Sequence, residues 1–71
     1  IEEKWIESVI SDFLWQQDEG KRNVFIRRYW YFESIEGICE RTGFSQSKVK
    51  SMLFEMRRRL KDRLEREGIQ V

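Results

Sequence analysis

The sequence has no proline and no histidine, and it contains one cysteine, Cys39, in 71 residues. A lone cysteine cannot form a disulfide within the chain, and without histidine an ordinary zinc site or a histidine-based catalytic triad lacks its ligands. No stretch approaches the roughly 18 consecutive apolar residues of a transmembrane helix, and no signal-peptide pattern is present. These absences exclude most classes of enzyme and predict a chain that uses no metal, no cofactor and no membrane.

The composition is typical of one small helical domain. Charged residues make up 38% of the chain, too many for a membrane span, and aromatic residues make up 14%, too many for a disordered tail. Because 71 residues can enclose only a small core, we expect residues 1–71 to form a single domain. The chain opens without methionine in the middle of a helical pattern, so we also expect it to be a piece of a longer protein.

Charge is distributed unevenly along the chain, although the net charge is only +1. Residues 1–20 carry a net charge of −5, residues 21–40 carry +1, and residues 41–71 carry +5. A basic C-terminal surface of this kind favours binding to a polyanion, and the acidic N-terminal part does not. A solvated helix face is the simpler interpretation of such charges when they are considered alone.

Apolar spacing predicts four helices and no strand. The first covers residues 2–16 and the second residues 21–31, with a break at residues 18–20. The third follows the N-cap residue Ser34 and ends at Gly43, which can adopt the left-handed conformation that terminates a helix. The fourth covers residues 46–67 after a second N-cap, Ser45. It has the most regular apolar stripe in the chain, formed by Val49, Leu53, Met56, Leu60 and Leu64.

Several aromatic side chains are expected to lie inside this arrangement. The run at residues 30–32 is expected to close the hydrophobic core, and Trp5 and Trp15 are expected to pack the first helix against it. Cys39 is expected to be a packed, unreactive thiol rather than a redox switch. The second helix is expected to turn inward Val24, Phe25 and Tyr29.

Residues 34–60 fit a helix-turn-helix, in which two amphipathic helices are joined by a short turn that contains glycine. Gly43 supplies the turn, and Ser45 allows the second helix to begin directly after it. The apolar residues that would fix the crossing of the two helices are Ile35, Ile38, Cys39, Phe44, Val49 and Leu53. The second helix of such a motif can lie in the DNA major groove with its N-terminal residues against base edges.

The outward face of that second helix follows by elimination from its inward stripe. Glutamine can pair with adenine, lysine can donate to guanine, serine can serve either base, and phenylalanine can contact a thymine methyl group. The residues predicted to contact bases are Gln46, Ser47, Lys50, Ser51 and Phe54. Lys48, the arginines at residues 57–59 and Lys61 are better suited to phosphates, which accept flexible cations without a fixed geometry.

The same residues carry a family resemblance. Residues 47–60, SKVKSMLFEMRRRL, resemble the recognition helix of region four in sigma-70 factors of bacterial RNA polymerase, and most closely the extracytoplasmic-function type. Residues 21–45 resemble that family's pattern of an arginine, an apolar run, an aromatic end, a serine and a glycine. The positions that hold this pattern are Arg22, Val24, Phe25, Ile26, Tyr29, Ser34, Ile38, Cys39 and Gly43. The resemblance covers roughly residues 1–65; it is strong over residues 34–60 and loose before residue 20.

The resemblance implies an all-α domain that recognises the promoter −35 element in the major groove and docks on the β flap of RNA polymerase in the cytoplasm. An anti-sigma factor is a further candidate partner, and no catalytic reaction is implied for the chain itself. Base contacts fall on the five residues named above. Phosphate contacts fall on Lys48, Arg57, Arg58 and the backbone at Ser34, where a helix N-terminus can hold an anion.

Three residues depart from the family pattern. Met52 and Glu55 stand where arginine is common, so two cations are missing from the expected DNA contacts, and Met52 is expected to fill a gap at the core edge. Gly37 stands in mid-helix, where glycine costs about 1 kcal/mol relative to alanine.

Two other classes of function remain open. One is a helix-turn-helix effector domain of the response-regulator type, which dimerises on paired half-sites, whereas a sigma region acts as one copy on one element. The other is a protein-interaction module, in which the stripe over residues 49–64 pairs with a partner helix. That stripe departs from a strict heptad and is short for a coiled coil.

Overall fold

The computed structural model describes residues 3–69, and within them it contains α-helices and no β-strand. The helices are α1 (Glu3–Gln16), α2 (Glu19–Tyr29), α3 (Ile35–Thr42) and α4 (Gln46–Arg66). The prediction of an all-α domain with four helices is confirmed for these residues, and the expected helix start at Glu2 lies outside them. No helix in the described part of the chain combines the length and the apolar character needed to cross a membrane.

Two of the helix starts lie where their capping residues predict. Ser34 and Ser45 have extended backbones, and their hydroxyl oxygens accept hydrogen bonds from the N–H groups of Gly37 and Lys48, at 3.0 Å and 3.1 Å. Each bond satisfies a backbone donor that has no partner within the helix. Gly43 ends α3 in the left-handed conformation, with φ of 78°, as predicted.

The predicted bounds of the second helix are wrong at both ends. The break between the first two helices covers residues 17–18 rather than 18–20, and Asp18 in it caps α2: its side chain accepts a hydrogen bond from the Lys21 N–H at 2.9 Å. The helix therefore begins at Glu19, two residues earlier than predicted. It ends at Tyr29 rather than at Tyr31, because the chain turns away through residues 30–34.

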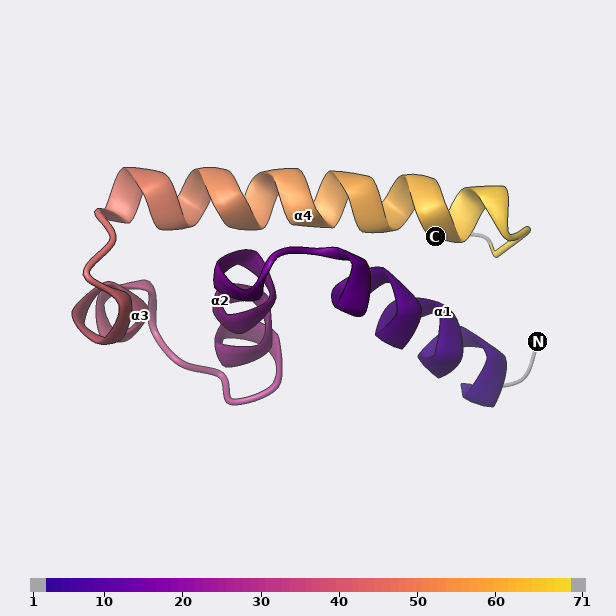
Figure 1. Ribbon diagram of the computed structural model, residues 1–71, viewed down its shortest axis with the longest axis horizontal. Helices are drawn as coiled ribbons and strands as arrows, with labels where there is room; N and C mark the ends of the chain where they lie inside the picture. Colours follow the sequence, from indigo (N-terminus) through magenta and orange to yellow (C-terminus); the bar gives the residue numbers. More distant parts are fainter. Residues whose placement is uncertain (1–2, 70–71) are drawn as a thin grey trace.

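The longest helix, α4, runs along the length of the molecule, and the other three helices lie on one side of it (Figure 1). In this view α2 and α3 are seen nearly end-on, so they cross α4 steeply. Helix α4 packs against each of the other three helices, and α2 also packs against α3. One face of α4 is therefore covered along its length, while the opposite face has no neighbouring helix among residues 3–69.

The core lies between α4 and the three helices beside it. The predicted stripe of α4 faces this core: Val49, Leu53 and Met56 are buried there, and Leu60 is partly buried against it. The other buried members of this cluster are Phe13, Leu14, Val24, Phe25 and Ile38. Leu64 is also buried, in a second small cluster with Val9 and Ile69 that joins the end of α4 to α1. The predicted rotation of α4 is thus confirmed.

The predicted burial of the aromatic run is wrong. Trp30, Tyr31 and Phe32 are 62%, 70% and 84% exposed. They follow the end of α2, beyond the part of that helix whose Val24 and Phe25 face the core, and they belong to neither buried cluster. Their place is a turn between α2 and α3 rather than a helix face.

Trp5 and Trp15 are also exposed, against expectation, and Trp15 is 71% exposed. Helix α1 turns Val9, Phe13 and Leu14 inward, and a residue next to Leu14 points about 100° away from it around the helix. The Trp15 ring packs instead against the Arg22 guanidinium, whose central carbon lies 4.5 Å from the ring centroid. Tyr29, at the end of α2, is exposed and not turned inward as predicted, although its ring lies 4.8 Å from that of the buried Phe25.

Candidate nucleic-acid interface

The uncovered side of α4 presents all five residues that the sequence assigns to base contacts. We call this set the outer face of α4: Gln46, Ser47, Lys50, Ser51 and Phe54. Every one of these side chains is exposed, and all come from the first nine residues of the helix. Phe54 is an exposed apolar ring among polar neighbours. The outer face therefore offers hydrogen-bonding groups and one apolar contact on a single rigid element.

The orientation of this face is fixed by the junction of α3 and α4. The Gly43 N–H donates to the Cys39 carbonyl at 2.8 Å, and the Phe44 N–H donates to Oγ1 of Thr42 at 3.2 Å. A left-handed residue at this point lets the chain reverse within three residues, 43–45, before α4 begins. All six predicted junction residues belong to the core: Ile38, Val49 and Leu53 are buried, and Ile35, Cys39 and Phe44 pack against them.

The predicted phosphate-binding residues are exposed, but they are not gathered in one place. Lys48 lies on the first turn of α4, where its Nζ is 4.2 Å from the centroid of the Phe44 ring. Arg57 turns toward α2 and donates from Nη1 to the Tyr29 hydroxyl at 2.6 Å. Arg58 lines a shallow depression with part of the outer face. Ser34 lies on a different helix, where its hydroxyl caps α3.

The shallow depression brings together the central part of the outer face. It has a volume of about 380 Å³ and is lined by Lys50, Ser51, Phe54, Glu55 and Arg58. Gln46 and Ser47 precede it by one turn on the same helix. Cations and hydrogen-bonding groups thus lie side by side over about three turns of α4.

Glu55 is a member of this site that the sequence did not assign. Its carboxylate pairs with Arg59 one turn along α4, and its Oε1 lies 3.9 Å from Nζ of Lys21 on α2. The four-residue spacing to Arg59 is a signal that the sequence does contain. The contact with Lys21 joins residues far apart in the chain, and no local pattern could have identified it.

The structure also explains the residues at the other two positions that depart from the resemblance, Met52 and Gly37. Met52 is partly buried and packs against the core, as predicted for a residue that fills a gap. A Cβ atom at Gly37 would lie 3.1 Å from Cγ of Glu33 and 3.2 Å from Oγ of Ser34. Glycine at this position therefore leaves room for the capping serine and for the glutamate beside it.

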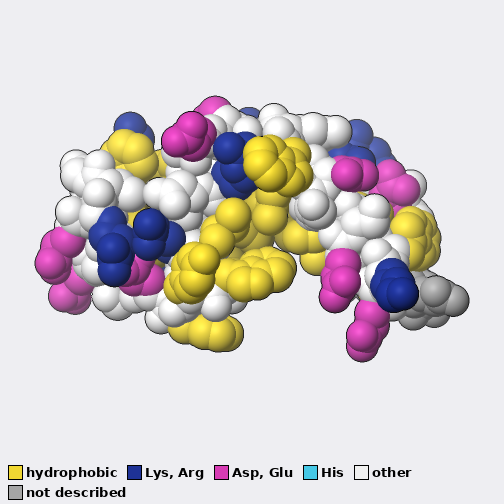
Figure 2. All heavy atoms as spheres, turned by 60° about the horizontal axis from the view of Figure 1, so that its bottom comes forward, with side chains coloured by type: hydrophobic (Ala, Val, Ile, Leu, Met, Phe, Trp, Pro, Cys, Tyr) yellow, Lys and Arg dark blue, Asp and Glu magenta, His cyan; other side chains and the backbone are white. Residues whose placement is uncertain are grey.

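A second exposed surface lies on the side of the molecule away from α4. We call it the aromatic surface: Trp15, Trp30, Tyr31 and Phe32. Trp15, Trp30 and Tyr31 line a groove of about 710 Å³ between α1 and α2, together with Ile10, Leu14 and Ile26. Phe32 does not line this groove. Figure 2 shows apolar side chains gathered in the middle of this face, with acidic side chains across a notch from them. Exposed apolar patches of this kind mark interaction sites.

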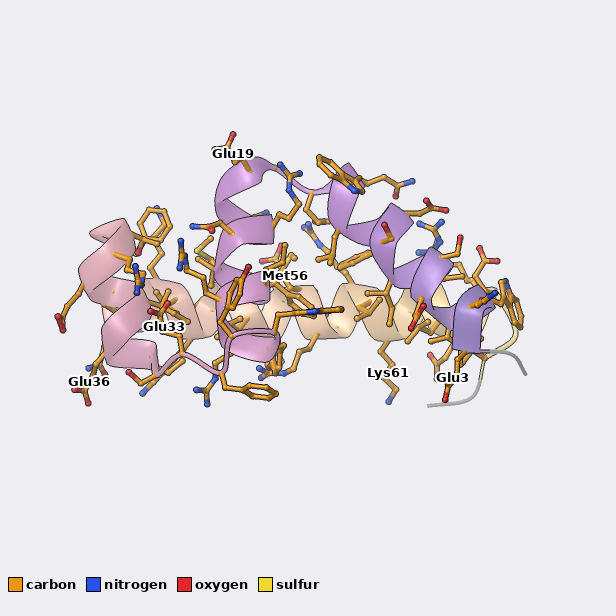
Figure 3. All side chains as sticks on the ribbon, turned by 90° about the horizontal axis from the view of Figure 1, so that it is seen from below. Glu3, Glu19, Glu33, Glu36, Met56 and Lys61 are labelled. Atoms are coloured by element: carbon orange, nitrogen blue, oxygen red, sulfur yellow. The ribbon has the colours of Figure 1, made fainter. Side chains whose placement is uncertain are left out.

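The turn that carries the aromatic run is held by Glu33. Its N–H donates to the Arg27 carbonyl, and its carbonyl accepts from Nη1 of Arg28, both at 3.0 Å. Its carboxylate pairs with Arg41 of α3 and lies 3.8 Å from Nη1 of Arg27. Figure 3 shows Glu33 between α2 and α3. Within this turn Phe32 has a φ of 55°, a left-handed conformation that is unfavourable for a bulky side chain.

Replacement of Phe32 by glycine is expected to stabilise the chain, because glycine adopts a positive φ without strain. Relative to Phe32→Ala, which removes the same ring but keeps a Cβ atom, we expect a gain of about 0.5–1 kcal/mol in the free energy of unfolding. Urea denaturation followed by circular dichroism would measure the difference. A glycine variant less stable than the alanine variant by about 0.5–1 kcal/mol, the ordinary entropy cost of glycine, would show that the backbone at Phe32 is not strained.

Comparison with known proteins identifies no relative of this chain. No protein-family model, no curated protein and no solved structure matches it. The similarity of residues 34–60 to region four of sigma-70 factors therefore stays a resemblance between residues, and the function is inferred from the residues and their geometry.

Proposed function

We propose that this chain is a helix-turn-helix DNA-binding domain that acts as region four of a bacterial sigma factor. In this proposal α3 and α4 are the two helices of the motif, and α4 enters the major groove of the promoter −35 element. One observation carries the proposal: α4 is locked into the core along one side and presents five exposed residues suited to base contacts on the other.

The chemistry of the outer face supports recognition of base edges. The Gln46 amide can donate to and accept from adenine, the Lys50 ammonium can donate to guanine, and the Phe54 ring can pack on a thymine methyl group. These side chains come from the N-terminal half of α4, which is the part of a recognition helix that contacts bases. Exposed Lys48 and Arg58 lie on the same helix as these residues and suit contacts with backbone phosphates.

Docking on RNA polymerase is the second part of the proposal. The aromatic surface supports it, because exposed tryptophan, tyrosine and phenylalanine side chains anchor protein interfaces. We propose that an apolar segment of the polymerase β flap occupies the groove between α1 and α2. A domain of this kind contributes binding and no reaction of its own, acts in the cytoplasm, and exposes surfaces that an anti-sigma factor can cover.

Replacement of Lys50 by alanine tests the proposed base contact. We expect the variant to lose discrimination at one position of the preferred site, by about 1–3 kcal/mol, because a lysine that donates to guanine rejects other bases there. Binding to a set of duplexes that differ at single positions, measured by fluorescence anisotropy, would show the loss.

The matched control is Lys61→Ala, which removes the same charge from α4 at a side chain that projects away from the packed helices (Figure 3). This variant should weaken binding to all duplexes about equally. If Lys50→Ala did the same, Lys50 would be a phosphate contact and not a base contact. Two chains bound to inverted half-sites would favour the response-regulator type of domain.

A further inference from the structure

A carboxylate lies along the edge of α4 that carries the proposed phosphate contact Lys48. Lys48, Glu55 and Arg59 follow one another at spacings of seven and four residues, so they share one side of the helix. Glu55 is 40% exposed in its side chain, and its carboxylate pairs with both Arg59 and Lys21. It also borders the depression that contains Lys50 and Phe54. A negative charge thus stands next to the surface that would face DNA.

This ion-pair cluster adds little to the stability of the fold. Its three side chains are between 30% and 48% exposed, and ion pairs between exposed residues stabilise proteins weakly because water screens them. Its larger effect is on the charge that a polyanion meets. Glu55 pairs with two cations, Lys21 and Arg59, that would otherwise be free to contact phosphates. The negative charge of Glu55 itself also repels phosphates.

We propose that Glu55 is a specificity-determining residue that keeps non-specific binding to DNA weak. The proposal rests on the DNA-binding function proposed above. Non-specific affinity depends on the number of phosphates that a protein neutralises, whereas discrimination depends on contacts with bases. In this proposal, contacts between the outer face and its preferred bases hold α4 in one position and limit how far Lys21 and Arg59 can turn toward the backbone. On other sequences the chain can shift, and freed cations would strengthen binding.

The experiment compares Glu55→Gln with the wild-type chain on a random-sequence duplex and on the preferred duplex, in a titration of salt. At about 100 mM salt, each added phosphate contact strengthens binding roughly eightfold, so one or two contacts made by the freed Lys21 and Arg59 should raise affinity for the random duplex by roughly 8- to 60-fold. The slope of log affinity against log salt should steepen by about 1 to 2. Affinity for the preferred duplex should rise by less than half of that factor, and the melting temperature should change by no more than a few degrees.

Two further variants identify the cause. Glu67→Gln removes the same charge from a carboxylate that pairs with Arg63 at 3.4 Å, while Arg63 keeps its hydrogen bond to Oε1 of Gln16 at 3.1 Å. Because Glu67 lies near the end of α4, this variant should leave affinity for the random duplex within about twofold of wild type. Adding Lys21→Gln and Arg59→Gln to Glu55→Gln should return the affinity for the random duplex to near the wild-type value.

The outcomes separate this proposal from the function on which it rests. If the wild-type chain discriminates between the duplexes but Glu55→Gln has an unchanged slope, or strengthens binding to both duplexes equally, Glu55 does not determine specificity. If the wild-type chain binds neither duplex in a salt-dependent way, the proposed function and the role of Glu55 are both overturned.

Discussion

Replacement of Leu53 by alanine is expected to destabilise the chain by about 2–5 kcal/mol, the usual cost of removing a buried leucine side chain. Leu53 is 2% exposed and belongs to the main core cluster, in contact with side chains of neighbouring helices. A domain of this size has a total stability of about 4–10 kcal/mol, so the variant should lose between roughly a fifth and all of its stability. Thermal denaturation followed by circular dichroism would measure the loss.

Phe54→Ala is the matched control for this experiment, because Phe54 is the next residue and is 60% exposed. Its removal should change the free energy of unfolding by less than about 1 kcal/mol, since surface substitutions have small effects on stability. The same variant should nevertheless weaken binding to the preferred duplex. If Phe54→Ala unfolded the chain and Leu53→Ala did not, α4 would have the opposite rotation.

Affinity for DNA is expected to fall by roughly 100-fold when the salt concentration is raised from about 50 to 200 mM. The estimate assumes about four phosphate contacts, each with a log–log slope near −0.9 because counterions are released from the DNA. The predicted contacts are Lys48, Arg57, Arg58 and the backbone at Ser34. Arg57 fits this role although it is bonded to Tyr29, because a guanidinium has five donor hydrogens and the tyrosine uses one. Fluorescence anisotropy with a labelled duplex would give the slope.

The control for the salt titration is Arg58→Gln. Loss of one phosphate contact should reduce the slope by about 1 and leave the order of preference among duplexes unchanged. An affinity that does not change with salt in the wild-type chain would exclude contacts with phosphates. A wild-type slope equal to that of Arg58→Gln would exclude Arg58 from those contacts.

The parts of the fold that could be predicted are those with a local cause. Ser34 and Ser45 cap helices because a serine side chain reaches a backbone N–H group three residues along the chain. The stripe of α4 could be predicted because residues three or four apart share a face, whatever packs against them. Asp18 caps α2 in the same way, because its carboxylate reaches the Lys21 N–H group three residues along the chain, so this helix start also has a local cause.

The burial of the aromatic residues could not be predicted in the same way. A tryptophan is usually buried, but whether a particular one is buried depends on which side chains from distant parts of the chain fill the core first. Here Val24, Phe25 and Ile38 occupy the space that the run at residues 30–32 was expected to fill. The contact between Glu55 and Lys21 could not be predicted either, because it depends on how α2 and α4 lie relative to each other.

In the candidate site, too, features with a local cause could be predicted and features that depend on distant contacts could not. Exposure of the outer face follows from the stripe of α4, so it could be deduced by elimination, and the structure confirms it. That these side chains contact bases stays a prediction. The aromatic surface emerged only from the structure, because it depends on where α2 ends and on the left-handed turn at Phe32.

The placement of all three shorter helices on one side of α4 has a consequence for the order of assembly. A duplex approaching the bare side of this helix and a protein seated between α1 and α2 come from different directions, so neither blocks the path of the other. If the proposed function holds, the chain can bind the polymerase first and the promoter second, or the reverse, because the two surfaces do not overlap. It would then act as a rigid adaptor whose two partners bind and dissociate independently of each other.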